Sequence, residues 1–319
     1  MTTQILGLDF GGTKLAAGVF DVSRELLLAR RVCPTPSGGA RISLQCMLRM
    51  AHELLQEHPG IRHVGVSFGG PVEADGRIIR LSMHIPGWEN FALVEYLEQV
   101  LQLPTRLAND GDAAALAEQR LGAGRNTATL LYMTASTGIG GGIVINGHIH
   151  RGERGWAGEL GHIVLDPHGP ACPCGRNGCL EALASGLSIA RDMRAALFTT
   201  MPISMLHDLP SEQLSARDVA NAAHAGDALA KQVWLRAMRW IGCGLGSAAN
   251  LLNPGRIVIG GGLTRAAELF FEPVRAEAAR RIMDPELSIV PAAFGDNVGI
   301  LGGVALWLDD ELTEVAGDK

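Results

Sequence analysis

Apolar residues in the first part of the chain occur in short runs that are separated by turns. The runs 5–10, 15–20 and 26–32 are divided by a glycine turn and by a polar turn, and this pattern predicts three antiparallel strands. Residues 41–57 follow, and their apolar side chains recur at helical spacing. The remaining elements alternate and complete a βββαβαβα unit: strand 63–68, helix 91–101, strand 105–109 and helix 112–121, which ends at Gly122.

The same order of elements begins again near residue 129. A strand at 130–135, a glycine-rich turn at 136–142 and two further strands at 143–146 and 148–152 repeat the architecture of residues 5–31. The remainder is largely helical: a capping box at 215–218, a long helix at 227–252, a strand from 256 and a last helix at 300–308.

Two similar halves predict an α/β fold in which each half is a mixed sheet flanked by helices. The two glycine turns are then expected to face each other across a cleft, the kind of place where ligands bind. We expect a small domain of residues 1–111, joined by a C-terminal helix at 299–319, and a larger domain of residues 112–298. The larger domain carries a metal-binding segment at 162–179.

Composition excludes several functional classes. A formal net charge of -6 and the absence of any Lys/Arg run argue against a nucleic-acid partner. Apolar runs stay shorter than the roughly 18 residues that a membrane span needs, and the N-terminus carries no secretory pattern. We therefore expect a cytoplasmic protein with neither nucleic acid nor membrane as a partner.

Glycine-rich turns are the first candidates for ligand binding. The turn after the first strand offers a carboxylate, bare backbone amides, a hydroxyl and a cation: Asp9, Gly11, Gly12, Thr13 and Lys14. Amides at such a turn can hold phosphate oxygens, and the carboxylate can hold Mg2+ through water. The turn between 134 and 142, with Thr137 and Gly138, is a matching one. Either turn alone is more simply an ordinary hairpin, and it is the presence of two such turns that favours ligand binding.

Other phosphate-binding motifs are absent from the sequence, since neither a P-loop nor a GxGxxG between strand and helix occurs. Gly261 and Gly262 follow the strand at 256 and precede a helix, where adenine or ribose could lie against bare backbone. A simple strand-helix connection is the alternative.

Asn109 and Asp110 stand between a strand and a helix. A carboxylate at the end of a central strand is well placed to accept a proton from a hydroxyl that attacks a γ-phosphate. The alternative is that Asp110 or Asp112 is only the N-cap of the helix.

The strongest local signal is the group His162, Cys172, Cys174 and Cys179. Three thiolates and an imidazole complete a tetrahedral zinc shell, and four protein ligands leave no open position, so the zinc is expected to be structural. His168 is a competing ligand. Such a metal would also fix Glu159 and Glu181 in one small region, as rigid acceptors for a hydroxyl-rich ligand. Unpaired surface glutamates are the alternative.

Together these segments resemble the ROK family of bacterial sugar kinases and repressors, within the actin, Hsp70 and hexokinase-like superfamily. The resemblance covers nearly the whole chain and rests on six strings: DFGGTK at 9–14, ND at 109–110, STGIGGG at 136–142, GELGH at 158–162, CPCGRNGCLE at 172–181 and GGG at 260–262. It implies two ribonuclease H-like (actin-like ATPase) domains with a cleft between them and a zinc knuckle.

The resemblance also implies roles for residues. Asp110 would be the general base, and Asn109, Glu159, His162 and Glu181 would hold the sugar hydroxyls. The two glycine turns would hold the phosphates of ATP with Mg2+, and Gly261 and Gly262 would approach adenosine. The string SFGG at 67–70 replaces a GIPG-like turn of many relatives, so Gly70 is expected to border the sugar.

The predicted activity is transfer of the γ-phosphate of ATP to the 6-hydroxyl of a hexose. The strings PGWEN and GELGH resemble glucokinases, whereas DPHGPxCxCG also resembles N-acetylmannosamine kinases, and N-acetylglucosamine, allose, fructose and mannose kinases are further alternatives. We expect glucose. A sugar-responsive repressor would need a helix-turn-helix before the first strand, which begins near Ile5. A homodimer or homotetramer is implied by the resemblance.

Overall fold

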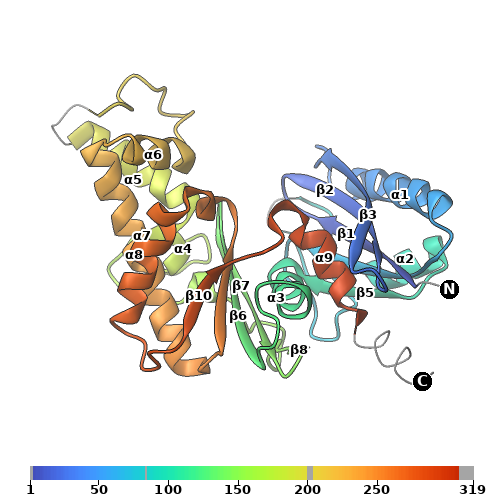
Figure 1. The fold of residues 1–319 in the computed structure, drawn as a ribbon. Coiled ribbons are helices and arrows are strands. Elements are labelled where there is room, and N and C mark those ends of the chain that lie inside the picture. Colours follow the sequence, from blue (N-terminus) through green and yellow to red (C-terminus); the bar gives the residue numbers. More distant parts are fainter. Residues whose placement is uncertain (1–2, 83–84, 200–203, 309–319) are drawn as a thin grey trace. The chain divides into compact units, whose positions relative to one another are not determined.

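The computed structural model describes residues 3–82, 85–199 and 204–308, and these form two compact units (Figure 1). The first unit takes its described residues from Met1–Tyr132, Gly142–Gly158 and Ala292–Lys319, and the second from Met133–Gly141 and Glu159–Pro291. The expected domain boundaries at 111/112 and 298/299 stay a prediction. Residues 309–319 of the expected C-terminal helix lie outside the described residues.

The first unit contains a five-stranded mixed sheet with the order β3-β2-β1-β4-β5. Its strands are β1 (Gln4–Phe10), β2 (Lys14–Asp21), β3 (Leu26–Pro34), β4 (Ile61–Phe68) and β5 (Thr105–Asn109). The pairs β1-β2 and β2-β3 are antiparallel, whereas β1-β4 and β4-β5 are parallel. With α1 (Ala40–Glu57), α2 (Leu93–Leu101) and α3 (Asp110–Leu121), the order βββαβαβα is confirmed.

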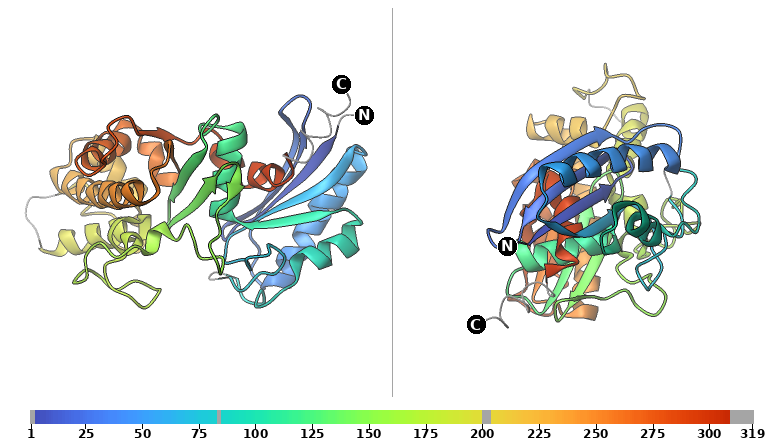
Figure 2. Two further views of the ribbon diagram at one scale, coloured as in Figure 1. Left: turned by 90° about the horizontal axis from the view of Figure 1, so that it is seen from below. Right: turned by 90° about the vertical axis from the view of Figure 1, so that its right-hand side faces the viewer.

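Alternation along the strands gives this sheet two different faces. In β1, the side chains of Leu6, Leu8 and Phe10 enter a core that includes the buried faces of α1 and α2. Figure 2 shows these two helices on one side of the sheet and α9 (Val298–Ala305) on the other. Since side chains alternate, Gly7 and Asp9 point to the α9 side.

Helix α9 lies unusually close to the sheet because glycines line the contact. A β-carbon on Gly7 would come within 2.3 Å of the Ile300 carbonyl oxygen, and one on Gly65 within 1.8 Å of the Gly303 carbonyl oxygen. Only residues without a side chain permit this approach. The last helix therefore belongs to the first unit, next to β1, the strand that carries Asp9.

The second five-stranded sheet has the order β10-β9-β6-β7-β8. Its strands are β6 (Thr129–Ala135), β7 (Ile139–Ile145), β8 (His148–Ile149), β9 (Arg256–Gly260) and β10 (Ser288–Pro291). Read from β8 to β10, this order matches that of the first sheet strand for strand, so the internal repeat is confirmed. Two expected bounds were wrong: β7 begins at Ile139 and runs through the glycines, and β8 ends at Ile149.

The rest of the chain is helical, as expected: α4 (Leu180–Ala184), α5 (Gly186–Thr199), α6 (Ala216–His224), α7 (Ala228–Leu252), α8 (Glu268–Ala279) and the 3-10 turns η1 (Leu160–His162), η2 (Gly262–Ala266) and η3 (Gly295–Asn297). Ser215 and Asp218 form the expected capping box at α6, and Asp227 caps α7.

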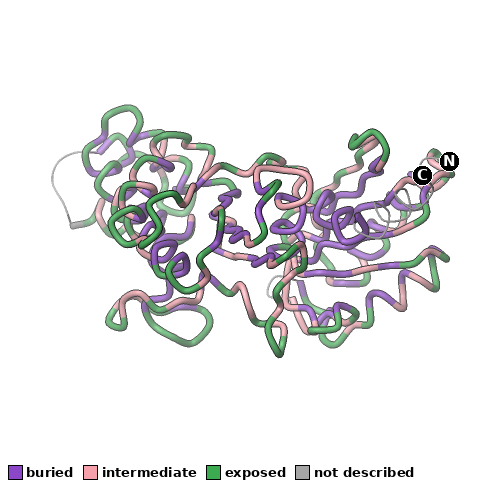
Figure 3. Tube along the Cα trace, turned by 60° about the horizontal axis from the view of Figure 1, so that its bottom comes forward, coloured by how far each residue is buried: buried purple, intermediate pink, exposed green. Residues whose placement is uncertain are grey.

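Burial follows the elements, because the strands run through the interior of each unit and the connecting loops stay at its periphery (Figure 3). Within the described residues, none of the helices has both the length and the apolar character that crossing a bilayer requires.

Candidate functional site

The first glycine turn is held by a residue that follows β3. The Gly11 amide donates to the Lys14 carbonyl oxygen (3.1 Å), which closes the hairpin. Thr35 fixes it from outside: its hydroxyl donates to the Gly11 carbonyl (2.7 Å) and its amide to the Thr13 carbonyl (3.0 Å). Gly12 and Thr13 at the tip are exposed. The hydrogen bonds thus hold the turn in one conformation, with the backbone of its tip exposed.

Asp9 lies beneath this turn at the end of β1 and is only 8% exposed. Burial and, to a smaller extent, the nearby Asp110 carboxylate raise the pKa of its carboxyl group, while Lys14 and Arg30 lower it, and the net result is a pKa of about 7. The Lys14 ammonium group donates a hydrogen bond to the Asp296 carbonyl oxygen (2.9 Å). A buried carboxyl group with a second carboxylate near it favours a bound cation.

Asn109, rather than Asp110 or Asp112, is the N-cap of α3. Its side-chain oxygen accepts hydrogen bonds from the amides of Gly111 (2.9 Å) and Asp112 (3.4 Å), and its side-chain amide donates to the Gly70 carbonyl oxygen (3.0 Å). The alternative that Asp110 or Asp112 caps the helix is therefore wrong. Asp110 occupies the first turn and is exposed, with one carboxylate oxygen accepting from the Gly111 amide (2.9 Å).

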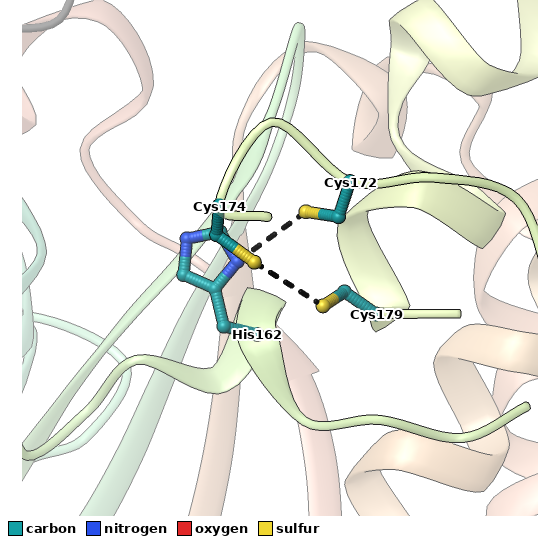
Figure 4. Close-up of side chains that lie close together, drawn as sticks. All are labelled: His162, Cys172, Cys174 and Cys179. Atoms are coloured by element: carbon teal, nitrogen blue, oxygen red, sulfur yellow. Dashed lines mark hydrogen bonds between the residues drawn. The ribbon is translucent and has the colours of Figure 1, made fainter. Parts of the chain in front are cut away.

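The second unit brings together the four residues expected to bind metal (Figure 4). Their ligand atoms all lie within 4.8 Å of one another. Cys172 Sγ is 3.7 Å from His162 Nδ1, and Cys174 Sγ is 3.6 Å from Cys179 Sγ. A tetrahedral zinc with Zn–S bonds of about 2.3 Å sets sulfur atoms roughly 3.8 Å apart. The donor set and its spacing thus fit zinc, and His168 is not part of the group.

Backbone pairing shapes the metal-binding segment. Leu165 and Leu180 donate their amides to the carbonyls of Gly178 and Ile163 (both 2.9 Å), so the two ends of the segment lie side by side. Gly178 has a φ of 66°, and a β-carbon there would fall 1.5 Å from the Asp166 carbonyl oxygen. Only glycine fits this position, and it directs Cys179 toward the other ligands.

The two glutamates expected near the metal have different surroundings. Glu159 Oε2 lies 3.9 Å from His162 Nε2, the ring nitrogen that faces away from Cys172, and its side chain is 46% exposed. Partial desolvation raises the pKa of Glu159, with His162 lowering and Glu181 raising it. Glu181, in the first turn of α4, accepts the Ile139 amide through Oε2 (2.9 Å). Neither is an unpaired surface glutamate.

The second glycine turn and the turn after β9 lie next to each other. Gly261 has a φ of 95°, and a β-carbon on it would come within 2.4 Å of the Ala135 carbonyl oxygen. One on Gly262 would be 3.4 Å from Ser136 Oγ. Thr137 is exposed beside them. Thr137, Gly138, Gly261 and Gly262 thus belong to one region of the second unit.

Within each unit, the residues expected from the sequence gather into one group. The first group is Asp9, Gly11, Gly12, Thr13, Lys14, Gly70, Asn109 and Asp110, and the second is the metal ligands with Thr137, Gly138, Glu159, Glu181, Gly261 and Gly262. The sequence did not reveal Thr35 and Asp296. Their only signal is polarity in a loop or turn, which many other positions share.

Comparisons with known proteins show the family and the fold of the chain. The model of the ROK family matches residues 5–310. A glucokinase of Halalkalibacterium halodurans is 36% identical over 310 residues, which cover 93% of each chain, and an N-acetylmannosamine kinase of Escherichia coli is 33% identical over 96% of this chain and 98% of its own. The crystal structure of a ROK family glucokinase from Streptomyces griseus in complex with glucose and AMPPNP superposes with a TM-score of 0.80, at 30% identity, covering 95% of this chain and 98% of that one.

Proposed function

The chain belongs to the ROK family and, like its relatives, is a sugar kinase; from this premise we propose that it transfers the γ-phosphate of Mg-ATP to the 6-hydroxyl of a hexose, with glucose as the preferred acceptor. Its curated relatives match over nearly their whole length and include glucokinases. A complex of one relative with glucose and the ATP analogue AMPPNP supports ATP as the donor.

The observation that carries the proposal is that Asn109, and not Asp110, caps helix α3. Asn109 satisfies the amides at the start of α3 and also holds the Gly70 carbonyl, so that Asp110 is not needed as a cap. Asp110 lies exposed in the first turn of α3. A carboxylate in this position suits a general base that takes the proton from the attacking 6-hydroxyl group.

For the donor, Asp9 is proposed to bind Mg2+, directly or through water. Its burial and its neighbour Asp110 both disfavour a lone negative charge, and a divalent cation would relieve this cost. The exposed amides of Gly12 and Thr13 would hold phosphate oxygens, with Gly11 and Lys14 closing the turn. Thr137 and Gly138 would do the same in the second unit, with adenosine against Gly261 and Gly262.

For the acceptor, Asn109, Glu159, His162 and Glu181 are proposed to bind sugar hydroxyls, and Gly70 to border the sugar. Carboxylates and an imidazole that are held by other contacts make specific acceptors for hydroxyl groups. Zinc is proposed to be bound by Cys172, Cys174, Cys179 and His162 Nδ1. It would supply structure rather than chemistry, since four protein ligands leave no position for a substrate.

N-acetylmannosamine is the second candidate acceptor, because an N-acetylmannosamine kinase is 33% identical to this chain, within the 30–36% range of the glucokinases. A coupled assay of ADP release with Mg-ATP separates the two. The panel is glucose, mannose, allose, fructose, N-acetylglucosamine and N-acetylmannosamine. We expect the highest kcat/KM for glucose. A higher value for an N-acetylhexosamine would transfer the assignment to that sugar, and ADP release from none of them would refute the kinase.

A further inference from the structure

The second glycine turn is held by backbone that is continuous with the metal-binding segment. Within the turn, the Ser136 amide donates to the Gly138 carbonyl oxygen (2.9 Å). From outside, the amide of Gly186 donates to the Ser136 carbonyl (2.8 Å) and that of Leu187 to the Thr137 carbonyl (3.3 Å). Both donors begin α5, a few residues after the last cysteine ligand. The conformation of the turn therefore depends on hydrogen bonds from the start of α5.

The peptide groups of Ile139 are contacted from both ends of the metal-binding segment. Glu181, two residues after Cys179, accepts the Ile139 amide at 2.9 Å, and a β-carbon on Gly138 would come within 2.5 Å of the same carboxylate oxygen. Gly161, next to His162, lies against the Ile139 carbonyl so closely that a β-carbon there would be 2.0 Å from its oxygen.

The position of Glu181 is itself fixed. Cys179 is the N-cap of α4, and Glu181 stands in the first turn of this short helix. The Glu181 carbonyl accepts the hydroxyl of Ser188 (2.7 Å) and the amide of Ser185 (3.0 Å), which ties α4 to the start of α5. A carboxylate that accepts an amide makes a charge-assisted hydrogen bond, stronger than a neutral one.

We propose that Glu181 is a positioning residue for the nucleotide: through the Ile139 amide it sets the conformation of residues 136–139, so that the metal-binding segment shapes the phosphate-binding turn as well as the sugar contacts. The inference rests on the proposed function, because it takes this turn to bind phosphate. Loss of the metal would then weaken nucleotide binding in the absence of any sugar.

The test uses the full-length, metal-loaded protein without sugar, with hydrogen exchange of the Ile139 amide and calorimetric titration of Mg-ADP as two separate readouts. Glu181→Ala is expected to speed exchange at Ile139 and to raise the Kd for ADP by about tenfold, the size of one lost charged hydrogen bond. Glu181→Gln keeps an acceptor oxygen and is expected to stay within about threefold of the parent.

Glu272→Ala is the matched control, since Glu272 is an exposed glutamate on α8 of the same unit; it should leave both readouts unchanged. Gly138→Ala perturbs the same contact from the other side and should weaken ADP binding even if Glu181→Ala folds poorly. Unchanged Ile139 exchange in Glu181→Ala would overturn the inference. Faster exchange with unchanged ADP affinity would instead refute phosphate binding by this turn, and with it that part of the proposed function.

Discussion

The carboxyl group of Asp9 lies directly against the backbone of Gly299, where a β-carbon would come within 2.2 Å of Asp9 Cγ. Asp9 is buried, with only 8% of its surface exposed. Gly299→Ala is therefore expected to displace the carboxyl group, to destabilise the fold by about 1–3 kcal/mol, and to lower kcat. Urea unfolding and the ADP-release assay measure the two effects. If the clash with Asp9 is the cause, the loss of stability must shrink in an Asp9→Ala background; equal penalties in both backgrounds would point elsewhere.

Asp9 also makes stability depend on pH. Its pKa is raised from an ordinary value of 3.8 to about 7, so the folded state binds more protons than the unfolded state between these values. The contribution of Asp9 to the stability of the protein without Mg2+ or nucleotide should therefore fall as the pH rises from about 4 to about 7 and then level off. Asp9→Asn has no such charge and should be more stable above pH 7, by up to about 4 kcal/mol, while losing kinase activity. A stability gap that does not widen between pH 4 and pH 7 would contradict this account.

Asp110→Asn removes the proposed base without changing the shape of the side chain. We expect kcat to fall by about 10² to 10⁴, with a smaller change in the Kd for Mg-ADP, because the proposed role of Asp110 is proton transfer rather than nucleotide binding. Asp112→Asn is the control: Asp112 is buried two residues farther along α3 and has no proposed role in proton transfer, so kcat should fall far less. Normal turnover in Asp110→Asn would exclude the residue as the base.

Short-range features of the site could be predicted from the sequence. The metal ligands lie within one short segment, so their types and the intervening glycines were enough to group them. The strand-turn-strand hairpins could likewise be predicted from apolar runs that glycine turns separate. Because this pattern occurs twice, the sequence also indicated that the two halves have the same order of strands.

Long-range contacts could not be predicted in this way. Thr35, Asp296 and Gly299 reach the first turn from other parts of the chain, and nothing in their local sequence indicates that contact. Strand β10 was missed because its four residues end in proline and show no period. Because glycine is rare in strands, the sequence predicts a turn for glycines 140–142, which lie in β7. A β-carbon on Gly142 would fall 2.3 Å from the Gly111 carbonyl oxygen, so close packing explains this glycine in the strand.

Removal of one thiolate tests the metal site. Cys174 is the exposed ligand, so Cys174→Ser leaves the buried packing of Cys172 and Cys179 in place. The parent protein is expected to carry about one zinc per chain by elemental analysis, and the variant to lose it together with several degrees of Tm. Cys243→Ser, on α7, should keep both the metal and the Tm. Full zinc content in Cys174→Ser would show that the four residues are not the ligand set.

Glu118 is fully buried in α3 and accepts three backbone amides, those of Ala123, Ala293 and Phe294. Glu118→Ala would leave these amides without an acceptor, at about 1–3 kcal/mol for each buried group, so a loss of at least about 3 kcal/mol is expected in urea unfolding. Glu118→Gln retains one acceptor oxygen and should lose less. Because residues 293 and 294 precede Asp296, whose carbonyl holds Lys14, both variants should also raise the KM for ATP more than that for the sugar. An equal rise in both KM values would indicate general loosening of the unit instead of a specific effect on the first glycine turn.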